Sequence, residues 1–304
     1  MSAKLIEISN ALAEVTEAVA ARTVAVHTEP RGSSSGVIWR DGIVVTAEHA
    51  LRRDEDIQLT LPDGRVVAAT LVGRDPSTDV AVLKCAEAGG APREFGDAGT
   101  LRPGSLTLVV GRTRASGAVA AVGVASLVAK ERRGWTGASF SPYVRLDVTI
   151  QPTAVGGAVV DATGRVVGIA SGRHARFGVV AVPAALIHAI VETLTQKGRI
   201  PQAYLGVGLQ PVRVPDAIRQ TLGRSEKTAA ILLEVQPDGP AGKAGLVIGD
   251  ILLSLDGGAV ARLEDVQSHL TSDSIGKKLA AKFLRGGASQ DATIVVGERP
   301  AGGE

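Results

Sequence analysis

Between residues 23 and 182 the sequence is a succession of short apolar runs separated by turn residues, and this pattern constrains the fold most. Aromatic residues make up only 3% of the chain and glycines number 37, so Val, Ile, Leu and Ala must build the core. Short β-branched runs bounded by Gly, Pro and Asp predict strands. The expected strands fall into two series, at 23–27, 36–38, 43–46, 57–61, 65–72 and 79–84, and at 106–110, 118–128, 143–147, 158–160, 165–171 and 178–182. Two series of about six short strands predict two β-barrels.

The first 22 residues have a different periodicity. Leu5, Ile8, Leu12, Val15 and Val19 recur at steps of three and four, which predicts an amphipathic helix. Its apolar stripe has two possible partners, its own domain or a neighbouring subunit. Acidic residues interrupt this segment, so it does not read as a secretory signal. We therefore expect a cytoplasmic protein if the chain is complete, and a periplasmic one if a leader was removed.

The last hundred residues mix strands with helices. Strands are expected there at 230–235, 250–255, 279–284 and 293–296, and helices at 240–244 and 263–270. A further helix is expected before them, at 184–195, directly after the second strand series. Residues 197–202 have the composition of a linker. The predicted organisation is an N-terminal helix (1–22), a two-barrel domain (23–198) and a C-terminal domain (199–304). The fold class is mainly β.

Composition excludes several classes of function. A formal net charge of +2 argues against a dedicated nucleic-acid binder, and no apolar run is long enough to span a membrane. Cys85 is the one cysteine, which rules out an intramolecular disulfide and a cysteine-cluster metal site. We expect no cofactor and no metal.

Three segments of the first barrel resemble the HtrA/Deg family of proteases. They are Gly32–Ile38, Val45–Ala50 and the Asp-x-x-Thr-Asp-Val-Ala motif within Gly73–Lys84. The resemblance implies a trypsin-like double six-stranded β-barrel followed by a PDZ domain, with His49 and Asp79 at the positions of the catalytic His and Asp. In such enzymes the His takes the proton of a serine nucleophile and the Asp orients the His.

The expected serine is missing from the corresponding segment. The family pattern Asp-x-x-Ile-Asn-Pro-Gly-Asn-Ser-Gly-Gly aligns with residues 147–157, which places Val155 at the nucleophile position. A valine side chain has no hydroxyl to attack a carbonyl. Thr153 replaces a glycine of the oxyanion hole, whose backbone N–H donors contribute about 10²–10³ in rate each. The resemblance therefore implies a degenerate member of the family.

Two alternatives remain open for this site. Another hydroxyl could replace the serine, and the nearby candidates by sequence are Thr153, Thr149, Ser139, Ser141 and Ser171. Alternatively, His49 and Asp79 are a hydrogen-bonded pair retained for packing between the barrels, which is the interpretation we favour. The remaining histidines considered, His27, His174 and His188, carry no partner motif.

The C-terminal segment resembles a PDZ domain of the HtrA type. Tyr204, Leu205, Gly206 and Val207 match the loop that binds a peptide's C-terminal carboxylate through backbone N–H groups, and the strand after it would pair with the peptide. Val266 and Leu270 would line the groove beside this loop, which implies an apolar C-terminal residue in the ligand. The alternative is a strand-start turn that binds nothing.

Three hypotheses follow. The first is a pseudoprotease that binds peptides or unfolded-protein C-termini, with a quality-control or scaffold role. The second is an active serine-type endopeptidase that uses His49 and Asp79 with an unidentified nucleophile. The third is a structural subunit that assembles with an active relative. The family resemblance also implies a homo-oligomer, with a trimer as the commonest family arrangement.

Overall fold

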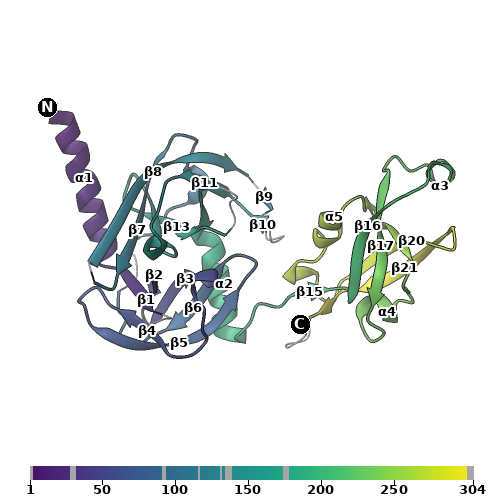
Figure 1. Cartoon of the computed structure of the whole chain (residues 1–304), viewed down its shortest axis with the longest axis horizontal. Helices are drawn as coiled ribbons and strands as arrows, with labels where there is room; N and C mark the ends of the chain where they lie inside the picture. Colours follow the sequence, from purple (N-terminus) through teal and green to yellow (C-terminus); the bar gives the residue numbers. More distant parts are fainter. Residues whose placement is uncertain are drawn as a thin grey trace. The chain divides into compact units, whose positions relative to one another are not determined.

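The structure is a computed structural model that describes residues 3–27, 32–90, 94–115, 117–130, 132–133, 139–173 and 178–299. It consists of two compact units, residues 1–200 and 201–304 (Figure 1). The prediction of a mainly β chain with two closed six-stranded barrels followed by a PDZ domain is confirmed. No helix among the described residues is long and apolar enough to cross a membrane.

The first barrel closes through antiparallel pairing of its first and fourth strands. The strand order is β1-β2-β3-β6-β5-β4. Its elements are β1 (Thr23–His27), β2 (Ser33–Arg40), β3 (Ile43–Ala47), the 3-10 turn η1 (Glu48–Ala50), β4 (Ile57–Thr60), β5 (Val66–Asp75) and β6 (Val80–Lys84). The predicted strands are all present. The second is longer than expected because serines at its start pair with β1 as readily as apolar residues do.

The second barrel repeats this architecture with the order β11-β14-β13-β12-β7-β8. Its elements are η2 (Ala98–Thr100), β7 (Leu106–Thr113), β8 (Gly117–Ala129), β11 (Tyr143–Asp147), η3 (Pro152–Ala154), β12 (Ala158–Asp161), β13 (Val166–Ser171) and β14 (Val179–Pro183). A small two-stranded sheet, β9 (Arg132–Arg133) and β10 (Ser139–Phe140), precedes β11.

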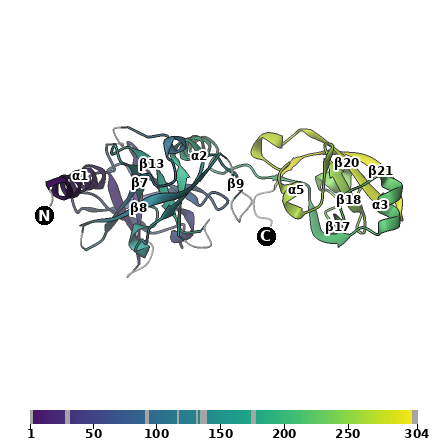
Figure 2. The same ribbon diagram turned by 90° about the horizontal axis from the view of Figure 1, so that it is seen from above.

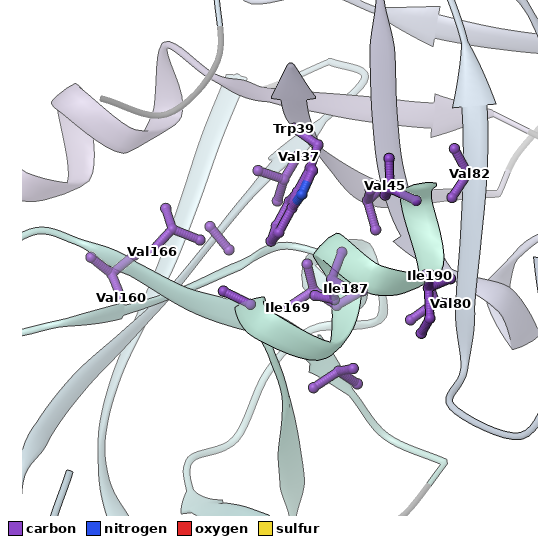
Figure 3. Packing of buried hydrophobic residues seen from close by; sticks show 14 of the residues in the cluster. Val37, Trp39, Val45, Val80, Val82, Val160, Val166, Ile169, Ile187 and Ile190 are labelled. Atoms are coloured by element: carbon purple, nitrogen blue, oxygen red, sulfur yellow. The ribbon is translucent and has the colours of Figure 1, made fainter. Parts of the chain in front are cut away.

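The largest hydrophobic cluster joins the two barrels and the helix α2 (Ala184–Lys197), as Figure 3 shows. Val37, Trp39 and Val45 enter it from the first barrel, Ile169 from the second, and Ile187 from α2. Each of these side chains is almost fully buried. Burial of a Val- or Ile-sized side chain stabilises the fold by about 1.5–3 kcal/mol, so this cluster fixes the barrels against each other.

Helix α1 (Ala3–Ala20) packs through its second half only. Leu12 and Val15 contact the core of its own domain, and Val19 is buried. In the first turns, by contrast, Leu5 is 63% and Ile8 is 54% exposed. The apolar stripe predicted from the sequence is thus partnered by the chain's own barrels at one end and exposed at the other.

The second unit holds a sheet in the order β16-β17-β18-β20-β21, so β16 is an edge strand. Figure 2 shows this unit with α5 and β17 in view. Its elements are β15 (Ala203–Tyr204), β16 (Val207–Arg213), α3 (Asp216–Leu222), β17 (Thr228–Val235), α4 (Pro240–Lys243), β18 (Ile251–Leu255), β19 (Gly258–Ala259), α5 (Leu263–Gln267), η4 (Ser272–Ser274), β20 (Lys278–Arg285), β21 (Ala288–Val295) and β22 (Gly297–Glu298). Helix α3 was not anticipated, and α5 ends earlier than the predicted 263–270 because its last turn closes with 3-10-like bonds.

Candidate active site and peptide-binding loop

His49 and Asp79 lie together in the first barrel. His49 is in η1, directly after β3, and Asp79 directly precedes β6. The His49 Nδ1 is 2.8 Å from both carboxylate oxygens of Asp79, and the His49 backbone N–H donates to Asp79 Oδ1 at 2.9 Å. This geometry fixes the imidazole ring with Nδ1 on the carboxylate and leaves Nε2 on the other side of the ring. The arrangement is that of the His-Asp pair of a trypsin-like triad.

Asp79 also accepts a hydrogen bond from a hydroxyl of the second barrel. Ser171, the last residue of β13, donates its Oγ–H to Asp79 Oδ2. Asp79 is fully buried, and burial pushes its pKa upward. The hydrogen bonds from His49 and Ser171 outweigh this effect, so the pKa of Asp79 lies below its usual value. Asp79 is therefore held as a carboxylate that both barrels contact.

His49 is held in a charged neighbourhood. Its hydrogen bond to Asp79 is the main reason why the pKa of His49 is raised, against the opposing effect of burial. Glu48 beside it is buried and pairs with Arg74 at 3.1 Å and with Arg173 at 2.9 Å. Arg173 follows β13, so this ion pair is a second link between the barrels. Sequence analysis did not identify Glu48 and Arg173, because a pair 125 residues apart leaves no local pattern.

The loop that the sequence aligns with the nucleophile position has Val155 in place of a hydroxyl-bearing residue. Val155 follows η3 and precedes Gly156, whose φ of +78° is the left-handed conformation that glycine permits. The Val155 N–H donates to the Pro152 carbonyl at 3.2 Å. In a trypsin-like oxyanion hole this N–H must be free to bind the substrate. Here it is engaged within the loop.

Ser35 of β2 holds this loop from the first barrel. Its N–H donates to the Val155 carbonyl at 2.8 Å, and its Oγ–H donates to the Thr153 carbonyl. The Ser35 Oγ in turn accepts the Arg112 N–H at 2.8 Å. The Arg112 guanidinium donates to the carbonyls of Ala20 and Thr23, at the end of α1 and the start of β1. The loop is thus fixed on both sides by bonds that do not involve the His-Asp pair.

The other candidate hydroxyls lie elsewhere or are engaged. The Thr153 Oγ1 is buried and has no hydrogen-bond partner among the described residues, and Ser171 donates to Asp79. Ser141 donates to the Lys130 carbonyl, and Thr149 is exposed. Among residues whose side chains are described, none hydrogen-bonds the His49 Nε2; the side chain of Ser139 is outside that set.

Two of the other histidines have structural partners. The Trp39 Nε1–H donates to the His188 Nδ1 at 3.0 Å, which helps to dock α2. The buried His27 shares a hydrogen bond with the Thr60 hydroxyl at 2.7 Å. His174 lies outside the described residues. No group of three or more His, Cys, Asp or Glu suited to a metal ion occurs in the part of the chain that is described.

The loop Tyr204–Val207 of the second unit has unused backbone donors. The carbonyls of Leu205 and Gly206 accept N–H groups of Ala241 and Gln236 at 2.9 and 2.8 Å. The N–H groups of Leu205 and Gly206 donate to no acceptor within the described residues. Gly206 has a φ of +72°, which lets successive N–H groups turn toward one point. Such a set of N–H groups can hold a carboxylate.

Apolar side chains lie beside this loop. Leu205 and Val266 are buried, and Val207, Leu209 and Leu270 pack against the same cluster. Val207 and Leu209 belong to β16, and α5, which carries Val266, lies next to this strand (Figure 1). The structure therefore brings the predicted loop residues and the predicted apolar residues together at the edge of one sheet.

Two sequence profiles match the chain. The trypsin-like peptidase domain covers residues 34–169, and the PDZ domain covers residues 203–296. Among curated proteins, the "Probable periplasmic serine endoprotease DegP-like" of Marinomonas sp. (strain MWYL1) is 32% identical over 273 residues, which are 88% of this chain and 57% of the relative. The protein of the same name from Brucella suis biovar 1 is 29% identical over 90% of this chain and 54% of the relative.

Solved structures with this domain order are similar over nearly the whole chain. The HtrA-type protease AlgW with a tripeptide has a TM-score of 0.71 and 28% identity, covering 96% of this chain and 99% of its own. The serine endoprotease from Yersinia pestis has a TM-score of 0.73 and 25% identity, covering 95% and 98%.

The fold and the profiles define a trypsin-like peptidase domain followed by a PDZ domain. Over both domains the chain is similar to proteases of the HtrA/DegP type. The chain spans a little over half the length of the curated relatives described above.

Proposed function

We propose that this chain is an HtrA-like protein without peptidase activity that binds peptides or unfolded-protein C-termini through its PDZ domain. The observation that carries the proposal is Val155. It stands where the family has its serine, and its N–H is bonded to the Pro152 carbonyl instead of being free for an oxyanion. Both the nucleophile and one stabilising donor are thus missing from the same loop.

The binding half of the proposal rests on the loop around Gly206. Within the described part of the chain, the N–H groups of Leu205 and Gly206 have no acceptor and β16 has a free edge. Together with the neighbouring apolar cluster, these features suit an extended peptide with a free carboxylate and an apolar last residue. The similarity to AlgW, solved with a tripeptide, supports this assignment.

The peptidase half is tested with a fluorophosphonate probe and fluorescently labelled unfolded casein on the full chain. We expect no labelling and no cleavage. Labelling and cleavage that disappear in His49→Ala would overturn the proposal. That result would establish the second candidate, an endopeptidase with a different nucleophile, which the intact His49–Asp79–Ser171 arrangement favours.

The binding half is tested by fluorescence anisotropy with a library of labelled peptides that differ in their last residues. We expect binding to apolar C-termini that Gly206→Asp weakens at least tenfold. Gly223→Asp is the matched control, because Gly223 also has a positive φ of 60° but lies at the end of α3. Equal binding by both variants, or no binding to any peptide, would refute the peptide-binding assignment.

We propose further that the protein works in the periplasm, in protein quality control or as a scaffold. The names of the curated relatives support the location. The exposed Leu5 and Ile8 of α1 support assembly with further copies or with an active relative, a trimer being the first possibility to test. The helical segment 1–22, barrel domain 23–198 and PDZ domain 199–304 are the units we propose for these roles.

A further inference from the structure

The free edge of β16 has a defined set of outward-facing backbone groups. The Gly206 carbonyl accepts the Gln236 N–H at 2.8 Å, so it points toward β17. The N–H of Val207 belongs to the same peptide unit and therefore points the opposite way, out of the sheet. Because backbone groups alternate along a strand, Leu209, Pro211 and Arg213 face outward as Val207 does.

The irregularity in this strand pair does not change that alternation. Gly208 pairs with Glu234, and the next residue, Leu209, pairs with Leu232. The extra residue is Leu233, so the bulge lies on β17 and β16 continues regularly. The far end agrees with this assignment, since the Val214 N–H points inward and donates to the Lys227 carbonyl at 2.9 Å.

A peptide that adds to this edge meets these groups in order. With its carboxylate on the N–H groups of Leu205 and Gly206, its last residue donates to the Val207 carbonyl. Its third residue from the C-terminus exchanges two bonds with Leu209, as an antiparallel pair does. Its fifth residue from the C-terminus faces Pro211, which has no N–H and whose ring carbon occupies the donor's place.

We infer that Pro211 interrupts the main-chain pairing, so that lengthening a bound peptide beyond its last four residues adds little affinity. This inference rests on the proposed peptide-binding function. Pro211 is exposed and lies within the edge strand, where a proline costs no bond inside the sheet. The missing N–H of Pro211 therefore removes no hydrogen bond from the domain itself. It removes a donor only from a strand that pairs with the outer edge of β16.

Fluorescence anisotropy on the full chain tests this inference. The probes are fluorescein-labelled peptides of four, six and ten residues with one apolar C-terminal tetrapeptide and an alanine-rich extension, so that length adds main-chain groups only. For the natural chain we expect Kd values that agree within twofold across the three lengths. In Pro211→Ala we expect the six-residue peptide to bind about 2- to 10-fold more tightly than the four-residue one, the usual range for one net hydrogen bond.

Pro215→Ala is the matched control, since Pro215 lies beyond the strand at the start of α3, and it should show no length dependence. Tighter binding of the longer peptides by the natural chain would overturn the inference and leave the proposed function intact. The same holds if Pro211→Ala and a second variant, Pro211→Val, gain nothing with length. Failure of every peptide to bind would refute the proposed function and the inference with it.

Discussion

Introducing a serine at position 155 should by itself give little activity, because the backbone N–H of Val155 is already bonded within its loop. In Val155→Ser the new serine would supply an Oγ, but the backbone N–H of residue 155 would still donate to the Pro152 carbonyl. Freeing this N–H requires rotation of the peptide unit between Pro152 and Thr153 by about half a turn. The same rotation takes φ of Thr153 from the 3-10 value near −60° to about +120°.

The magnitude follows from these two changes. The broken backbone hydrogen bond costs about 0.5–1.5 kcal/mol net and is common to every variant. Holding a threonine in a sparsely populated φ region costs about 1–3 kcal/mol, whereas glycine adopts it freely. Val155→Ser with Thr153→Gly should therefore turn over substrate about 5- to 150-fold faster than Val155→Ser.

The assay is the initial rate of cleavage of fluorescently labelled unfolded casein, with fluorophosphonate labelling to count active sites. Thr153→Gly alone should stay inactive, and His49→Ala in the double variant should abolish whatever activity is gained. Equal rates in the single and double variants would refute the argument from loop conformation. No activity in either would show that the substrate-binding elements have changed as well.

Two further predictions concern charge. Arg285→Ala should destabilise the PDZ domain, because Arg285 makes two bonds of 2.8 and 2.7 Å to the fully buried Asp250 carboxylate, which the variant leaves without its cation. Chemical denaturation measures this, and unchanged stability, or full rescue by Arg285→Lys, would contradict a two-bond role. In NMR titration His49 should show a pKa above its usual 6.5, and this pKa should fall in Asp79→Asn. Because the folded-state pKa is raised, the contribution of the His49–Asp79 hydrogen bond to stability is complete below pH 6.5 and is lost as the pH rises through the raised pKa. An unchanged His49 pKa in Asp79→Asn would contradict the role of Asp79 in raising it.

The sequence was sufficient to predict the two barrels and the PDZ domain because strand-forming runs and turns are local properties. The spacing of motifs was likewise sufficient to select His49, Asp79 and Val155 as the residues that align with the catalytic positions of the resembling family. Helix α3 was missed because it has only seven residues, between Pro215 and Gly223, and little apolar periodicity. Element ends such as that of α5 depend on how the last turn closes, which propensity does not specify.

The contacts that define the site were beyond a reading of the sequence. Ser171 was considered only as a substitute nucleophile, yet it is bound to Asp79 across 92 residues. The bond from the Val155 N–H to Pro152 depends on the loop's conformation, and the ladder position of Pro211 depends on which way one peptide unit points. Such facts come from tertiary placement and have no signature in residue spacing.

A buried His-Asp pair is not by itself a sign of catalysis in this fold. Asp79 accepts from His49 in its own barrel and from Ser171 in the other, and the Glu48–Arg173 ion pair spans the same boundary. Replacing Asp79 by alanine would leave the Ser171 hydroxyl unsatisfied in the interior, which costs about 1–3 kcal/mol whether or not a nucleophile is present. The pair therefore has a structural reason to persist beside a valine. Activity would depend instead on a reactive hydroxyl and on free oxyanion donors, and we propose that Val155 provides neither.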